Sequence, residues 1–187
     1  ERPDNLVEVR NLVVRFRTDE GIVSAVNSVS YDIPAGKTMG IVGESGCGKS
    51  VTANAIMRIL PENGWILSGS ILFNSTKGVF DIAGLSEKDK RTALPHGREM
   101  AMIFQEPMTS FCPVYTIGNQ IIESIRLHTD IPKSGWRDQA ISLLRKVRIS
   151  KPEQRVDEYP YQLSGGMRQR AMIAMALASK PRLLVAD

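Results

Sequence analysis

The chain opens with two stretches in which apolar and polar residues alternate. They run from Leu6 to Arg17 and from Ile22 to Ile33, with the turn-forming sequence TDEG between them. Alternation with a period of two turns one side of an extended chain toward a core, and a short polar turn joins two such runs as antiparallel neighbours. The pattern predicts a β-hairpin with one buried face.

The following residues predict a strand, a glycine-rich loop and a helix. After Pro34-Ala35-Gly36, the sequence KTMGIV at 37–42 favours a short strand, and residues 49–60 have a helical pattern that Pro61 ends. Two further strands are predicted, at Gly69–Phe73 and at Met100–Phe104.

The second half of the chain changes to apolar residues at helical spacing. Residues 117–149 predict two helices that Pro132 and Gly135 separate. A third helix is predicted at Gly166–Ser179, followed by the strand Leu183–Ala186, which runs into Asp187. Strands in alternation with helices indicate an α/β protein.

Composition narrows the class of protein only a little. The 187 residues are 42% apolar and carry a net charge of +4, which suits one globular domain with a small subdomain and is too weak to indicate nucleic-acid binding. Cys47 and Cys112 lack the spacing of metal ligands and are expected to be reduced thiols. The longest apolar run, AMIAMALA, is too short to cross a bilayer, so the chain is not expected to span one.

The glycine-rich loop matches a phosphate-binding pattern. GESGCGKS at 43–50 fits G-x-x-x-x-G-K-[ST] and lies between the predicted strand and helix. Its glycines let the backbone approach phosphate oxygens, Lys49 brings a cation to the β- and γ-phosphates, and the Ser50 hydroxyl can bind Mg²⁺. The residues predicted to contact the nucleotide here are Gly43, Glu44, Ser45, Gly46, Cys47, Gly48, Lys49, Ser50 and Val51.

A second candidate anion site begins the third helix. In LSGGMRQR at 163–170, Ser164, Gly165 and Gly166 open the helix with free N–H groups and a hydroxyl. A serine cap before an ordinary core helix would explain the SGG triplet alone. The buried strand that ends in Asp187 would present a carboxylate as a metal ligand.

Together these motifs resemble those of ABC ATPases. LSGGMRQR looks like the family signature, and Gln105 in IFQEP looks like the glutamine of its Q-loop. GIVGESGCGKS, MIFQEPMTS and YPYQLSGGMRQRAMIAMALASKPRLLVAD most resemble the ATPase subunits of bacterial oligopeptide and dipeptide importers, a group that includes nickel and opine carriers. The resemblance covers essentially the whole chain.

The resemblance implies a P-loop NTPase (RecA-like) core with an N-terminal antiparallel β subdomain and a helical subdomain. It divides the chain into residues 1–107 (β subdomain and core), 108–170 (helical subdomain) and 171–187 (return to the core). The C-terminal part of the core is expected to be missing. In SFCP at 110–113 the importers more usually have Ser-Leu-Asn-Pro, so Cys112 is expected to pack as a small buried residue.

The resemblance also implies ATP and Mg²⁺ as cofactors and assigns roles to residues. Lys49 and Gln105 would act in catalysis, and Ser50, Gln105 and Asp187 would hold the metal. Phe16 is the candidate to stack on adenine, with core packing as the alternative. In a head-to-tail dimer, the nucleotide bound at Lys49 of one subunit would be capped by Ser164, Gly165 and Gly166 of the other.

Asp187 fits the Walker B carboxylate, after which the family normally has the catalytic glutamate and, later, a switch histidine. The 187-residue chain is therefore expected to show little or no hydrolysis by itself. Neither His96 nor His128 lies where the switch histidine would, and both are expected on solvated loops. Tyr159 and Tyr161 are expected to be packing residues, with a functional role as the alternative.

The expected partners are a second ATPase subunit, two transmembrane permease subunits and, indirectly, a periplasmic or lipid-anchored binding protein. The expected location is the cytoplasmic side of the bacterial inner membrane, bound peripherally. A soluble ABC ATPase of DNA repair or translation and a non-catalytic nucleotide-binding fragment are the alternatives. Peptides, nickel and opines all stay open as substrates, because the other subunits select the substrate.

Overall fold

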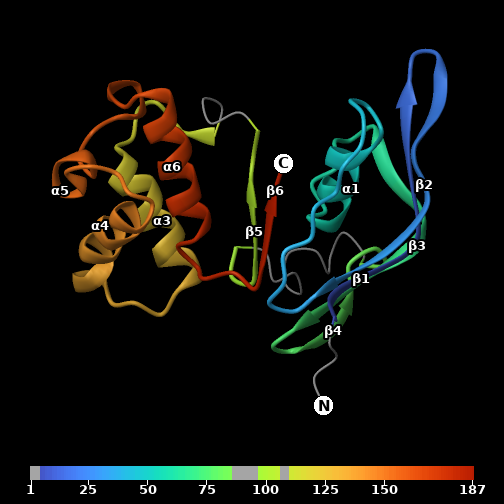
Figure 1. The fold of residues 1–187 in the computed structure, drawn as a ribbon, viewed down its shortest axis with the longest axis horizontal. Coiled ribbons are helices and arrows are strands. Elements are labelled where there is room, and N and C mark those ends of the chain that lie inside the picture. Colours follow the sequence, from blue (N-terminus) through green and yellow to red (C-terminus); the bar gives the residue numbers. More distant parts are fainter. Residues whose placement is uncertain (1–4, 86–96, 106–109) are drawn as a thin grey trace. The chain divides into compact units, whose positions relative to one another are not determined.

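The computed structural model describes residues 5–85, 97–105 and 110–187. The chain forms two compact units, residues 1–95 and 96–187. Figure 1 shows a β-rich first unit and a helical second unit. Each unit is described by itself.

The first unit is built on a four-stranded antiparallel sheet with strand order β2-β1-β3-β4. Its strands are β1 (Asn5–Thr18), β2 (Gly21–Pro34), β3 (Gly64–Ser75) and β4 (Gly78–Asp81). β1 and β2 form the predicted hairpin, with Arg17 opposite Ile22 beside the turn. β3 is longer than the predicted strand 69–73, and β4 was not predicted, because its four residues are too few to show a period.

One face of this sheet carries the core of the unit. Val7, Val9, Leu12 and Val14 of β1 are fully buried. The step from Val9 to Leu12 breaks the period of two, because the register shifts at a bulge where Asn11 has a φ of 46°. Helix α1 (Lys49–Ile56) contacts β1 and β2. The sheet thus supports the helix that follows the glycine-rich loop.

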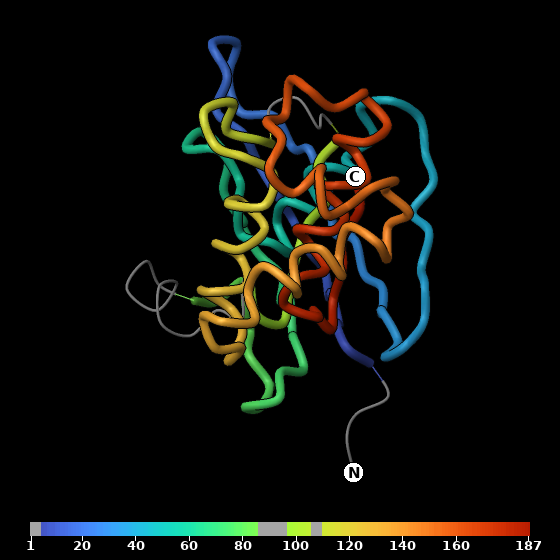
Figure 2. Tube along the Cα trace, turned by 90° about the vertical axis from the view of Figure 1, so that its left-hand side faces the viewer, coloured from blue at the N-terminus to red at the C-terminus, as the bar shows by residue number. Residues whose placement is uncertain are grey.

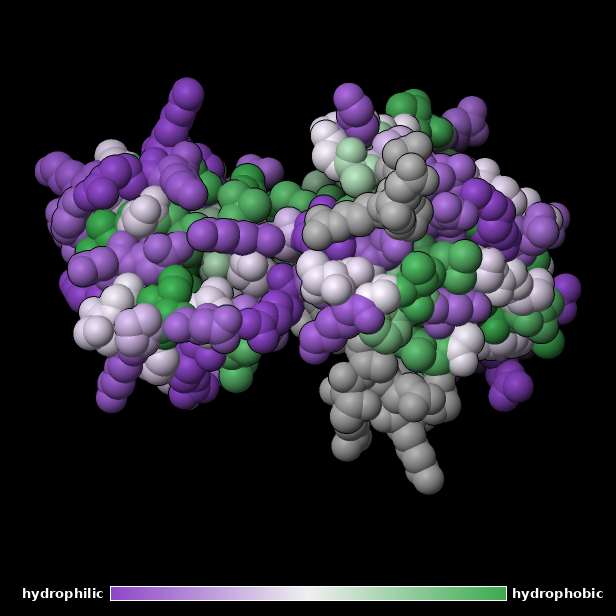
Figure 3. All heavy atoms as spheres, turned by 90° about the horizontal axis from the view of Figure 1, so that it is seen from below, coloured by the Kyte–Doolittle hydropathy of each residue, from purple (hydrophilic) through white to green (hydrophobic). Residues whose placement is uncertain are grey.

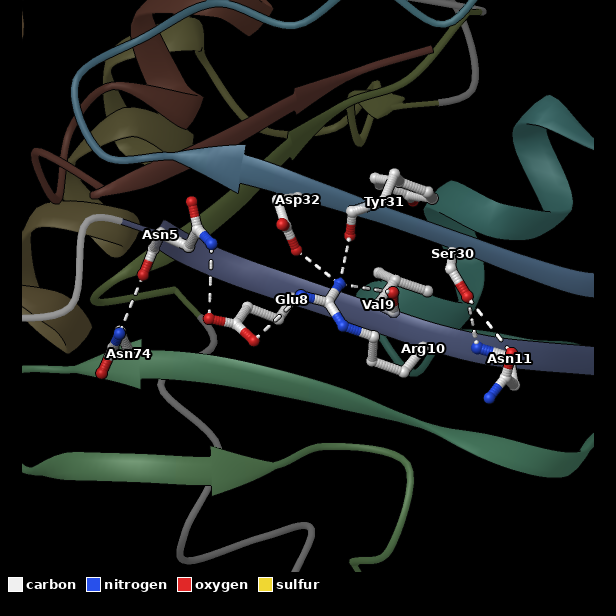
Figure 4. A network of polar contacts seen from close by, with 9 residues as sticks. All are labelled: Asn5, Glu8, Val9, Arg10, Asn11, Ser30, Tyr31, Asp32 and Asn74. Atoms are coloured by element: carbon white, nitrogen blue, oxygen red, sulfur yellow. Dashed lines mark hydrogen bonds and ion pairs between the residues drawn. The ribbon is translucent and has the colours of Figure 1, made fainter.

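Polar contacts of Arg10 tie the first two strands together (Figure 4). Its guanidinium donates to the carbonyl oxygen of Tyr31 over 3.3 Å and to the carboxylates of Asp32 and Glu8. At the bulge, the N–H of Asn11 donates to the Ser30 hydroxyl over 2.8 Å. β2 is therefore held to β1 by side chains in addition to the ladder.

The predicted strand at 37–42 is not formed. These residues belong to neither of the sheets in the described part of the chain, and Ile41 and Val42 are 47% and 96% exposed. Figure 2 shows this backbone as an open arc in light blue. A short apolar run becomes a strand only when a neighbouring strand pairs with it, and the four-stranded sheet of this unit ends at β2. Helix α1 is also shorter than predicted and ends at Ile56.

The second unit is a helical bundle with a small parallel sheet. Its main helices are α3 (Ile117–His128), α4 (Trp136–Lys146) and α6 (Gly165–Ala176), joined through α5 (Pro152–Arg155) and two short 3₁₀ turns, η2 (Lys133–Gly135) and η3 (Pro160–Gln162). β5 (Met100–Ile103) pairs in parallel with β6 (Leu183–Ala186). The predictions of these helices and strands are confirmed, with ends that differ by a few residues.

The helices bury apolar side chains from one stripe each. The fully buried ones include Ile117, Ile121 and Ile125 of α3 and Leu144 of α4, which meet Ala171 and Ala174 of α6. Recurrence at every fourth position is the helical period that the sequence showed. On the face drawn in Figure 3, hydrophilic side chains predominate over this unit. No helix in the described ranges is long and apolar enough to cross a membrane.

Three expectations about single residues are wrong. Cys112 is exposed, because the loop that carries it lies on the surface. Tyr161 is 68% exposed, and its ring stacks on that of Tyr159 with centroids 5.6 Å apart. His128 is the last residue of α3 and is partly buried, because its ring packs against Gly97; burial, and then the charge of Arg98, lower its pKa. His96 lies outside the described residues.

Candidate functional site

The glycine-rich loop places the N-terminus of α1 at the surface. Gly48 caps the helix with a φ of 94°, and Gly46 has a φ of 81°. A Cβ atom on Gly48 would lie 2.5 Å from the carbonyl oxygen of Ala25 on β2. Only glycine combines this left-handed backbone with so close an approach to a strand. The fold itself therefore requires glycine at position 48.

The first turn of α1 is open to an anion. Among the described residues no side chain caps it, and no acidic residue lies within it. The Lys49 ammonium donates to the carbonyl oxygens of Gly43 and Glu44 over 2.8 and 2.7 Å. The lysine thus lies across its own loop, beside the helix end where N–H groups and the helix dipole favour a negative charge.

The rest of the loop is accessible to a ligand. Gly43, Glu44, Ser45, Gly46, Cys47 and Ser50 are exposed, and Gly48, Lys49 and Val51 are partly buried. An anion that reaches the helix end can compete with the two carbonyl oxygens for the Lys49 ammonium, because phosphate is a stronger acceptor than a neutral carbonyl.

Phe16 lies near the end of β1 and is partly buried. It stands opposite Gly64 of β3, and its ring covers that residue, since a Cβ atom on Gly64 would lie 2.6 Å from the ring. One side of the Phe16 ring therefore packs against the protein, as the alternative of core packing expected.

The parallel sheet of the second unit brings Gln105 and Asp187 to one edge. Gln105 follows β5 and Asp187 follows β6, and the carboxyl ends of parallel strands meet at the same edge. The Asp187 N–H donates to the Ile103 carbonyl over 3.1 Å. The side chains of Gln105 and Asp187 are exposed. The edge therefore offers an amide oxygen and a carboxylate oxygen to the solvent.

These donors fit a hard cation such as Mg²⁺, which prefers oxygen ligands and usually keeps several water or phosphate ligands. Among the described residues, no group of three or more His, Cys, Asp or Glu side chains could hold a metal by itself. Within the second unit the protein ligands would be few, namely Asp187 and Gln105. Phosphate oxygens would complete the shell.

The signature segment, defined here as residues 163–170, presents the N-terminus of α6. Ser164 caps the helix, and its hydroxyl accepts the N–H of Met167 over 3.3 Å. Gly165 and Gly166 are exposed, and a Cβ atom on either would meet nothing within 4 Å among the described residues. Neither has a positive φ. The part of the chain that the structure describes gives no packing reason for glycine at these two positions.

The turn before the signature segment was not foreseen from sequence in its details. The side chain of Gln162 accepts the Tyr159 N–H over 2.8 Å, and the Arg168 guanidinium donates to the Pro160 carbonyl over 3.3 Å. These bonds fix the backbone that leads into Ser164. The only sequence signal was Pro160, which favours a turn but does not indicate which side chains hydrogen-bond to it.

A protein-family model described as ABC transporter matches residues 26–187. The chain is 45% identical over its whole length to the oligopeptide transport ATP-binding protein OppD of Bacillus subtilis and covers 51% of that protein. It is 47% identical over 97% of its length to the dipeptide transport ATP-binding protein DppD of Escherichia coli and covers 54% of it. The chain thus spans about half the length of these curated relatives.

A solved structure confirms the fold. The dimeric ATP-binding cassette MJ0796, in a post-hydrolysis state with ADP and phosphate, superposes with a TM-score of 0.82 at 23% identity. The match covers 97% of this chain and 73% of that one. By its fold and its family match, this chain belongs to the ABC transporters, as part of their ATP-binding P-loop NTPase cassette.

Proposed function

We propose that the chain is the nucleotide-binding part of an ATP-hydrolysing subunit that drives a bacterial importer of peptides or a related small solute. The observation that carries the proposal is the pair of exposed, glycine-rich helix ends, at Gly48 and at Ser164, in a chain similar along its length to peptide-importer ATPases. Two anion sites on one chain suit two copies that share nucleotides between them.

The proposed chemistry is positioning and neutralisation of charge. Lys49 leaves the carbonyl oxygens of Gly43 and Glu44 and binds the β- and γ-phosphates, while N–H groups of the loop and of α1 hold phosphate oxygens. Phe16 stacks on the adenine with the ring face that Gly64 does not cover. Ser50, Gln105 and Asp187 would hold Mg²⁺, which would supply neutralisation of the phosphate charge.

The signature segment acts on a nucleotide that a second subunit holds. Ser164, Gly165 and Gly166 offer a hydroxyl and N–H groups to the γ-phosphate, with no side chain at the glycines to keep the phosphate away. Dimers of a related cassette support this arrangement. ATP would then favour the closed dimer, and its hydrolysis would release it.

The proposed assembly contains two such subunits, bound at the cytoplasmic face of the inner membrane, and two permease subunits that span the membrane. A binding protein delivers the solute from outside. The transport names of the relatives support this.

Titration with ATP tests the proposal. Lys49→Ala is expected to lower the affinity by at least about tenfold, because each charge-assisted hydrogen bond contributes about 1.5–3 kcal/mol. Lys37→Ala is the matched control, since Lys37 is an exposed lysine of the same unit outside the loop. Equal affinity of both variants and the wild type for ATP would contradict a nucleotide site at Lys49.

A further inference from the structure

Gln120 of α3 makes three hydrogen bonds to the loop that precedes the helix. Its side-chain oxygen accepts the Cys112 N–H over 2.8 Å. Its amide nitrogen donates to the carbonyl oxygens of Cys112 and Tyr115, each over 3.0 Å. A primary amide offers a donor pair and an acceptor at once, which no carboxylate, hydroxyl or ammonium side chain does.

The bound loop has little packing of its own. Its two ends are anchored by Phe111, which is 5% exposed, and by the fully buried Ile117. Between them, Val114 and Tyr115 are 70% and 56% exposed. Cys112, Tyr115 and Gln120 also line a hollow of about 650 Å³, into which the loop could move without steric resistance. The hydrogen bonds of Gln120, more than apolar contacts, hold the middle of the loop in place.

This loop is the next described segment after Gln105. On one side, the Gln105 segment is fixed by β5, whose Ile103 carbonyl accepts the Asp187 N–H. On the other side, it leads after a few residues into Phe111 and the bonds to Gln120. A segment that must place one amide near a phosphate needs both of its ends fixed, because an error of about 1 Å can cost on the order of a hundredfold in rate.

We propose that Gln120 is a positioning residue for nucleotide hydrolysis, which fixes the loop 111–116, the next described segment after Gln105. The functional part rests on the role proposed above for Gln105. The structural part, that the Gln120 amide is what holds the loop, stands without it. Gln120 touches no reacting atom in this proposal.

The experiment is hydrogen–deuterium exchange of the whole protein, read in peptides that cover residues 110–117. Gln120→Glu keeps the acceptor but replaces both donors with a carboxylate that faces two carbonyl oxygens, and Gln120→Leu removes all three bonds. At about pH 8 both variants are expected to exchange about tenfold faster than the wild type in this peptide. Peptides from α4 and α6 in the same samples report whether the unit has folded.

Two controls separate positioning from a general loss of structure. At about pH 4, just below the ordinary glutamate pKa of about 4.3, the new glutamate is mostly protonated and again donates one bond. Exchange of Gln120→Glu, corrected for the intrinsic rate, is therefore expected to return toward the wild type, while that of Gln120→Leu is not. Asn119→Asp makes the same amide-to-carboxylate change at the neighbouring exposed residue and is expected to leave the loop unchanged.

Turnover of the whole protein tests the functional part. Gln120→Glu and Gln120→Leu are expected to lower kcat severalfold and to leave ATP affinity unchanged, because both keep the phosphate-binding loop 43–50 intact. If the loop exchanges at the wild-type rate in both variants, the proposal that the Gln120 amide holds the loop is wrong. A loosened loop with unchanged kcat, where Gln105→Ala lowers kcat, would overturn the positioning role. Unchanged kcat in Gln105→Ala itself would show instead that the proposed role of Gln105 is wrong, whatever the exchange shows.

Discussion

The two glycine-rich helix ends look alike in sequence but differ in why they need glycine. At α1, Gly48 has a left-handed backbone, and a Cβ atom there would lie 2.5 Å from the Ala25 carbonyl oxygen. At α6, Gly165 and Gly166 have ordinary backbones and open space where a side chain would lie. The fold therefore demands glycine at the first end and tolerates other residues at the second.

This difference separates two kinds of functional glycine. Gly48 shapes a loop that binds its ligand within one chain. Gly165 and Gly166 are explained by something that comes close from outside the chain, and a phosphate held by another subunit is our proposal. Stability measurements alone should distinguish the two ends.

The largest effect is expected for Gly48→Ala. The left-handed φ and the contact with Ala25 should together cost about 2–4 kcal/mol in the free energy of unfolding. Denaturant titration measures this cost. Gly36→Ala is the control, because Gly36 also has a positive φ, of 68°, but open space around it, so only the backbone cost of about 1–2 kcal/mol should remain. Equal losses in the two variants would show that the contact with β2 is unimportant.

A smaller effect is expected for Ser164→Ala. Loss of the cap to Met167 should lower the free energy of unfolding by about 1 kcal/mol. Thr129→Ala removes a hydrogen bond at the C-terminal end of α3, which the Thr129 hydroxyl donates to the Ile125 carbonyl over 2.7 Å, and should cost a similar amount. Only Ser164→Ala should also slow ATP turnover by the whole protein. If turnover falls equally in both variants, the signature end has no role beyond that of an ordinary cap.

The smallest effect is expected for Tyr31→Phe, on the strand that supports Gly48. The Tyr31 hydroxyl is buried without a hydrogen-bond partner among the described residues, so its removal should change stability at neutral pH by less than about 1 kcal/mol. Burial raises the pKa of Tyr31 from 10.0 to about 12. Between these values the folded protein keeps a proton that the unfolded chain loses, so stability falls as pH rises through this range.

Denaturant titrations from neutral to alkaline pH check this slope. Tyr31→Phe should flatten the fall that begins near pH 10. The wild type, measured in parallel at each pH, is the reference for this slope. A wild-type slope in Tyr31→Phe would show that the buried phenol is not its cause.

The elements that could be predicted from the sequence are those that a local pattern of apolar residues marks. The β1–β2 hairpin and the three main helices of the second unit follow from periods of two and 3.6 residues, and both parallel strands follow from short continuous apolar runs. Residues 37–42 could not be placed in this way, because whether an apolar run forms a strand depends on a partner that is distant in sequence.

The candidate site divides along the same line. GESGCGKS and the signature segment could be found because each carries its chemistry in consecutive residues. The contact of Gly48 with Ala25, the cover of Phe16 over Gly64 and the bonds of Gln120 to Cys112 could not, because each joins residues whose approach only the folded backbone sets. The exposure of Cys112 was missed for the same reason.

The most direct test of the contrast between the two helix ends is Gly166→Ala, with the free energy of unfolding and ATP turnover by the whole protein measured on the same preparation. Alanine fits the open space at the first turn of α6 and is a better helix former than glycine. The free energy of unfolding should therefore stay constant or rise by up to about 1 kcal/mol, while turnover falls at least about tenfold, because the added methyl group keeps the phosphate away from the N–H groups of the helix end. Lower stability together with wild-type turnover would contradict the account.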